Sequence, residues 1–245
     1  MDNDRLNNHI ASGQGIANRR RFLKNGVILG TVTGLAGLNL ITGCSKEKGE
    51  EISPAEDLMR EHGLLNRILL IYDNCSAKLT TGEQFPMDAL INSAMIIRSF
   101  IEDYHEKLEE DFLFPRFIKA NHLTELVTVL QQQHKAGRQI TDQIISIGKM
   151  PVLEAPAERQ KLTGLLSLFN RMYRPHEARE DTVLFPEMRK IISPEEYFEL
   201  GESFEDMEHE LFGEEGFESN VQKVEEIEKL VGIYELSAFT PVIMD

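Results

Sequence analysis

One short phrase that could bind a cation occurs twice in this chain of 245 residues. The two copies are HEKLEEDFLFP, which begins at His105, and HEAREDTVLFP, which begins at His176. In each copy a glutamate, Glu109 or Glu180, follows the histidine by four residues, and another acidic residue comes next. Residues four apart in an α-helix lie about 40° apart around its axis, so each histidine and its glutamate would face the same side.

Helices must position the repeated phrase, because the apolar residues from Pro54 onward recur at helical spacing and no period-two strand pattern is evident. The first stretch breaks at Thr80-Thr81-Gly82, the second runs from Pro86 to about Ala120, the third closes at Gly148 and Pro151, and the fourth runs from about Ala157 to Ser193. Pro175 predicts a kink just before His176. Four long helices with short connections predict an all-α fold, an up-down-up-down four-helix bundle. Two further helices, at 195–212 and 221–230, are expected to pack on its outside.

Each of the four expected helices carries one histidine in its apolar stripe. These are His62, His105, His134 and His176. A single buried histidine is most often a hydrogen-bonded core residue, but four inward imidazoles would be costly unless a bound group used their lone pairs. With Glu109 and Glu180 they form a set of four nitrogens and two carboxylates, which suits iron or manganese and, less selectively, zinc.

The ordered motifs resemble those of the hemerythrin-like, or HHE cation-binding, domain. They are EHG at 61–63, HEKLEEDFLFP, QHK at 133–135 and HEAREDTVLFP. The resemblance covers about 55–192 and implies a non-haem di-iron centre inside a four-helix bundle. It further implies that the four histidines are terminal ligands of two iron ions and that Glu109 and Glu180 bridge them, with manganese or zinc less expected.

The resemblance leaves two ligand positions open. Asp181 competes with Glu180 for the second bridge, because oxygen-carrying members of the family have an aspartate five residues after the last histidine. Glu106 is a possible extra ligand, although its step of about 100° from His105 points it away from that ring.

Arg138 stands where the oxygen carriers of the family have a fifth histidine. It follows His134 by four residues, so we expect it beside the site, where a guanidinium cannot ligate a metal. It would either pair with a carboxylate such as Asp181 or hold an anionic ligand. This departure argues against reversible oxygen transport.

The first 43 residues resemble an export signal and are excluded from the fold. NRRRFLK at 18–24 resembles the bacterial twin-arginine motif, with Arg19 and Arg20 as the pair. The apolar run that follows ends in ITGC, which resembles a lipobox whose Cys44 would be lipidated; an uncleaved membrane anchor is the alternative. The expected organisation is therefore a signal at 1–43, a charged tether at 44–54, the bundle at 55–192 and a helical extension at 193–245.

Composition limits the partners of this chain. It has 26 basic and 41 acidic residues and a net charge of −15, which disfavours binding to nucleic acid or to anionic lipid headgroups. After processing at Cys44, Cys75 is the one thiol left, which excludes an internal disulfide in the mature chain and disfavours a thiolate metal site.

The sequence thus predicts an exported, lipid-anchored, non-haem di-iron protein that binds or senses oxygen, nitric oxide or peroxide outside the cytoplasm. One alternative is a di-iron oxidoreductase that reduces peroxide or nitric oxide with a donor that the sequence does not identify. Another is a metal-free helical interaction module. Whether the protein is an enzyme stays open, as do its physiological ligand, redox partner, membrane leaflet and oligomeric state.

Overall fold

The computed structural model describes residues 53–149 and 155–243, and within these ranges it contains helices and no strand. The first bundle helix, α2 (Pro54–Thr81), begins at a capping box, in which Ser53 Oγ accepts from the Glu56 N–H and the Glu56 carboxylate accepts from the Ser53 N–H. It ends at Gly82, whose φ of 78° lies in the left-handed region that favours glycine.

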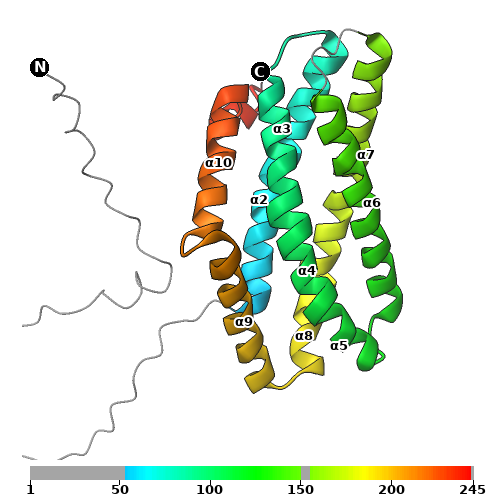
Figure 1. Ribbon diagram of the computed structural model, residues 1–245, viewed down its shortest axis with the longest axis vertical. Coiled ribbons are helices and arrows are strands. Elements are labelled where there is room, and N and C mark those ends of the chain that lie inside the picture. Colours follow the sequence, from blue (N-terminus) through cyan, green and yellow to red (C-terminus); the bar gives the residue numbers. More distant parts are fainter. Residues whose placement is uncertain (1–52, 150–154, 244–245) are drawn as a thin grey trace, which may run out of the picture. The chain divides into compact units, whose positions relative to one another are not determined.

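The remaining long helices follow the predicted order. The second is continuous and consists of α3 (Met87–Ile96), η1 (Ile97–His105), α4 (Glu106–Leu108), η2 (Glu109–Leu113) and α5 (Phe114–Lys119); the third is α6 (Thr124–Gly148); the fourth consists of α7 (Pro156–Arg179), η3 (Glu180–Leu184) and α8 (Phe185–Ile191). α2 packs against α7 and α3, and α6 packs against α7 and α3, which closes the four-helix bundle (Figure 1). The predicted fold class is confirmed.

Both copies of the repeated phrase contain a π-helical turn, η2 and η3. Its wider spacing is visible in the backbone, since the Phe114 N–H donates to Glu109 O and the Phe185 N–H donates to Glu180 O, five residues back. Pro115 or Pro186 follows at once, and proline cannot donate the next bond of an α-helix. π-helical turns inside α-helices are frequent at functional sites, and here each begins at a glutamate singled out above.

Pro175 does not interrupt the fourth helix. α7 is continuous from Pro156 to Arg179. His176 is therefore presented from a helix that continues on both sides of it.

The C-terminal residues add helices outside the bundle. α9 (Pro194–Phe212) lies against α2, and α10 (Gly216–Val231) lies against α2 and α3 (Figure 1); the short η4 (Leu236–Phe239) follows. α10 begins five residues earlier than predicted, because Glu208 Oε1 accepts a hydrogen bond from the Phe217 N–H at 2.6 Å and holds its first turn. Arg67 of α2 donates from Nε to Glu228 Oε1 of α10 at 2.9 Å.

Cys75 is fully buried in α2, and burial raises the pKa of its thiol to about 12. The sequence places it on the side of α2 turned away from His62. α2 is thus covered on more sides than a helix of an isolated four-helix bundle would be, because α9 and α10 also contact it.

Among the described residues, none of the helices combines the length and the hydropathy that spanning a bilayer requires. The predicted signal, its arginine pair and Cys44 lie outside the described residues, as does most of the predicted tether.

A close contact between α6 and α7 requires a glycine. A Cβ atom at Gly137 would lie 2.0 Å from the Tyr173 hydroxyl oxygen, and that hydroxyl donates to Glu106 Oε1 at 2.6 Å.

We expect Gly137→Ala to lower the free energy of unfolding by about 1–3 kcal/mol in urea titrations, because the buried phenol cannot move without losing its partner. Gly164→Ala is the matched control: nothing lies within 4 Å of its added Cβ, so alanine should be neutral or stabilising by up to about 1 kcal/mol. Equal effects of the two substitutions would contradict the close packing of Gly137.

Candidate metal centre

Four histidines and two glutamates meet in the centre of the bundle. Glu180 lies between two rings, with its Oε2 3.4 Å from His62 Nε2 and its Oε1 3.1 Å from His176 Nε2. Glu109 Oε2 lies 3.4 Å from His134 Nε2 and 3.9 Å from His105 Nε2. All six side chains are at most 4% exposed. The six residues singled out by their spacing are thus brought together, each histidine with its Nε2 atom turned inward.

The two carboxylates lack protein partners that would justify their burial. All four carboxylate oxygens of Glu109 and Glu180 are buried and have no hydrogen-bond partner among the described residues. Burial, reinforced by the charge of Glu180, raises the pKa of Glu109 well above its usual range. Buried polar atoms are nearly always satisfied, so the centre lacks positive charge that a cation would supply.

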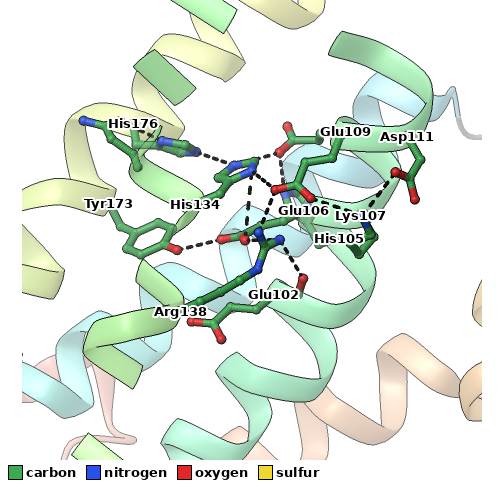
Figure 2. Close-up of polar contacts among 12 residues, drawn as sticks. Glu102, His105, Glu106, Lys107, Glu109, Asp111, His134, Arg138, Tyr173 and His176 are labelled. Carbon is green, nitrogen blue, oxygen red and sulfur yellow. Dashed lines mark hydrogen bonds and ion pairs between the residues drawn. The ribbon is translucent and has the colours of Figure 1, made fainter. Parts of the chain in front are cut away.

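The inward atoms fall into two overlapping groups that could each hold a metal ion. One consists of His62, His105 and Glu109, and the other of Glu109, His134, His176 and Glu180. The Nε2 atoms of His134 and His176 are 3.3 Å apart, a separation that two ligands of one cation can have (Figure 2). Glu109 belongs to both groups, as a bridging carboxylate would.

A hydrogen bond on the opposite side of each ring fixes these inward nitrogens. The distances from Nδ1 are 2.7 Å for His62 to Asp181, 2.7 Å for His105 to Glu61, 3.1 Å for His134 to Glu110 and 2.9 Å for His176 to Gln133. We call Glu61, Glu110, Gln133 and Asp181 the outer partners. Three of the outer partners are carboxylates, which when ionised can only accept, and Gln133 presents its amide oxygen, so each Nδ1 carries a proton and each Nε2 faces the centre. Metal-binding histidines are oriented in this way.

Burial keeps two of these rings neutral. It lowers the pKa of His105 well below its usual range, helped by neighbouring His62, and it also lowers the pKa of His134. At His62 burial opposes the charge, but the carboxylates of Asp181 and Glu180 raise the pKa to about 10. The negative potential that holds a proton on His62 would equally attract a metal cation.

The phenylalanine of each Leu-Phe-Pro segment covers one histidine. Phe185 stacks on His62 and Phe114 stacks on His134, with 5.5 Å between ring centroids in both pairs. Both phenylalanines are at most 1% exposed. The repeated segment therefore excludes water from the site at two corresponding places.

Asp181 and Glu106, the two residues left open as ligands, lie outside the central set in this structure. Asp181 contacts the outer nitrogen of His62 and is 34% exposed, whereas Glu180 occupies the centre. Glu106 is buried, but Tyr173 donates to its Oε1 at 2.6 Å and Arg138 Nη2 lies 2.8 Å from its Oε2 (Figure 2).

Arg138 does not pair with Asp181, the carboxylate suggested by the sequence. Its partners are Glu106 and Glu110, and Nη1 lies 2.7 Å from Glu110 Oε1. Burial opposes ionisation of Glu110, but hydrogen bonds from His134 and Arg138 lower its pKa to about 2. Arg138 thus contacts the site through Glu110, the outer partner of His134.

Sequence reasoning missed Glu61, Glu110 and Gln133. A positional signal exists for each: Glu61 and Gln133 directly precede the single histidines of the first and third helices, and Glu110 directly follows Glu109 as Asp181 follows Glu180. The acidic residue repeated after each central glutamate was visible, but its contact with a ring on another helix requires the packed bundle.

Comparison with known proteins agrees with this site. Residues 53–151 match the family model described as the hemerythrin HHE cation-binding domain. Uncharacterized proteins from two strains of Mycobacterium tuberculosis and from Mycobacterium bovis are 43% identical over 91% of this chain and 91% of their own length. No solved structure shows significant similarity.

The chain therefore belongs to one family with these mycobacterial proteins and carries a hemerythrin HHE cation-binding domain. Such a domain implies a metal cofactor, and the buried histidine and glutamate clusters are positioned to hold one. The matched range includes the first three histidines, while His176 and Glu180 come from the fourth helix beyond it.

We expect Glu109→Gln to weaken metal binding by at least about tenfold, because the neutral amide removes the carboxylate that both groups share. Glu180→Gln should act similarly, and Asp181→Asn less, since Asp181 contacts an outer nitrogen. The measurement is metal content after dialysis against graded chelator. Asp111→Asn is the control, because Asp111 is exposed on the same helix and pairs with Lys107. A larger loss in Asp181→Asn than in Glu180→Gln would reverse the assignment of the second bridge.

Proposed function

We propose that this chain is an exported, lipid-anchored non-haem di-iron protein that binds or senses a small ligand such as oxygen, nitric oxide or peroxide. One observation carries the metal site: four inward Nε2 atoms surround two buried carboxylates that lack hydrogen-bond partners among the described residues. A metal-free interaction module would leave these carboxylates unsatisfied at a cost of several kcal/mol, on the order of magnitude usual for buried charges.

The ligand set favours two cations. Six ligands exceed what one tetrahedral ion uses, and they divide into two groups that share Glu109. His62 and His105 would hold one ion and His134 and His176 the other, with Glu109 and Glu180 between them. Nitrogen and carboxylate ligands without thiolate suit iron, with manganese or zinc as less favoured occupants.

The chain's own residues prepare the site for a small ligand. Bound iron would supply redox chemistry and an open coordination position. Phe114 and Phe185 exclude water, and the outer partners hold the rings in one orientation. The side chains around the centre are buried, which favours a diatomic molecule or peroxide over a larger substrate.

Arg138 supports ligand sensing or handling over reversible oxygen carriage. At the position where the resemblance implies a fifth histidine in oxygen carriers, this guanidinium cannot ligate and is held by Glu106 and Glu110. The half of the site at His134 therefore has one protein nitrogen fewer than such a carrier would have. Reduction of peroxide or nitric oxide is the alternative, and turnover with an added reductant distinguishes it from binding alone.

Loading with ferrous iron tests the proposal directly. Purified protein that is reconstituted without oxygen and then desalted should retain two iron ions per chain, because two groups of ligands are present. Iron is counted by elemental analysis, and an optical spectrum recorded after exposure to oxygen should show a ligand-to-iron charge-transfer band. One iron per chain would contradict the bridged centre, and none would favour the metal-free alternative.

Export and anchoring are proposed from the sequence of the first 44 residues. A twin-arginine system passes folded proteins, which suits a bundle that closes around its metal before export. In a bacterium with this pathway, replacing Arg19 and Arg20 by lysine should leave the precursor in the cytoplasm, and Cys44→Ala should abolish lipid labelling. Arg21→Lys is the control, because it changes the neighbouring arginine outside the pair. Fractionation and immunoblotting report the outcome, and normal export of the double-lysine variant would remove the twin-arginine assignment.

A further inference from the structure

The site has two halves whose residues correspond position by position. The first half is His62 and His105 with their outer partners Asp181 and Glu61; the second half is His134 and His176 with Glu110 and Gln133. The correspondence follows from the sequence, since Glu61 and Gln133 directly precede His62 and His134, and Glu110 and Asp181 directly follow the two central glutamates. It extends one layer further, where Asn66 donates to Glu177 and Arg138 pairs with Glu106.

Two of the corresponding pairs differ in charge. Glu61, a carboxylate that is fully buried, contacts His105, whereas the neutral amide Gln133 contacts His176. Neutral Asn66 corresponds to Arg138, whose positive charge lies 2.7 Å from the outer partner Glu110. Both differences make the surroundings of the first half more negative than those of the second.

The other corresponding positions do not cancel this difference. Glu110 and Asp181 are both acidic, as are Glu106 and Glu177. Glu102 and Tyr173 also correspond and differ in charge, but Arg98 Nη1 lies 2.7 Å from Glu102 Oε2 and offsets that carboxylate.

We propose that the two cation positions are unequal: the first half binds the tighter cation and fills first, and Glu61 and Gln133 set this order. The inference rests on the two-cation site proposed above. It assigns Glu61 and Gln133 as positioning residues that act on the metal through His105 and His176.

The physical reason is that an outer partner changes both the donor strength of the ring and the local potential. A carboxylate that accepts the Nδ1–H makes the imidazole more basic at Nε2, and a neutral amide does so less. The full charge of Glu61 is shielded little by solvent because it is buried, and it attracts a dication. In the second half Arg138 offsets the negative charge of Glu106 and Glu110, whereas neutral Asn66 leaves the corresponding carboxylates of the first half without such an ion pair. The protein can therefore hold one metal ion, or two different ones.

Two reciprocal substitutions, Glu61→Gln and Gln133→Glu, test the order in which the two cation positions fill. Apo-protein of the full chain is titrated with cobalt(II) in competition with a chelator, and two stepwise Kd values are obtained. The wild type should give two steps whose Kd values differ by at least about tenfold. Glu61→Gln should weaken the first step by about 10–100-fold, and Gln133→Glu should tighten the second step. Tightening is informative, since damage to the fold does not strengthen binding.

Glu187→Gln is the matched control, because Glu187 accepts from His122 Nε2 at 2.8 Å in another histidine–carboxylate pair outside the site. It should leave both steps unchanged. If Glu61→Gln fails to fold by circular dichroism, the Gln133→Glu titration decides alone. Two equal steps in the wild type would overturn the inequality, and an unchanged second step in Gln133→Glu would overturn the role assigned to Gln133; both outcomes leave the two-cation site intact. Binding of fewer than two cations by the wild type would instead overturn the proposed function.

Discussion

The structure depends on one constraint: Glu109 and Glu180 are fully buried at the centre of the bundle, between four histidine rings. Their oxygens face Nε2 atoms on four different helices and find no other partner among the described residues. A charge in such surroundings requires a compensating charge. The bundle therefore combines close packing with a centre whose buried histidines and carboxylates are positioned to hold a cation.

Each residue type in the repeated phrase contributes to this centre. Its histidine and central glutamate face inward, and the next acidic residue reaches the outer nitrogen of a histidine on another helix. Its phenylalanine stacks on that same histidine, and its proline follows a π-helical turn. Each copy thus orients and covers a ring that belongs to the other half of the chain, which ties the four helices to a single centre.

Arg138 shows how one residue changes the character of such a site. A guanidinium one turn after His134 cannot complete the ligand set, and here it is neutralised by Glu106 and Glu110. Gly137, the residue before Arg138, has no Cβ and so leaves room for the Tyr173 hydroxyl, which donates to the same carboxylate, Glu106. The two halves share a backbone plan but differ in the charge around them.

The sequence by itself determined the all-α fold, the ends of the long helices and the six residues at the centre, because helical periodicity and the spacing of four residues are local properties of the chain. Only the tertiary structure decided what lies behind each ring. Glu61, Glu110 and Gln133 became visible as outer partners, and Asp181 and Arg138 received their contacts, when helices distant in sequence packed together. Spacing fixes which way a side chain points from its own helix, but its partner on another helix depends on how the helices are packed and rotated against each other.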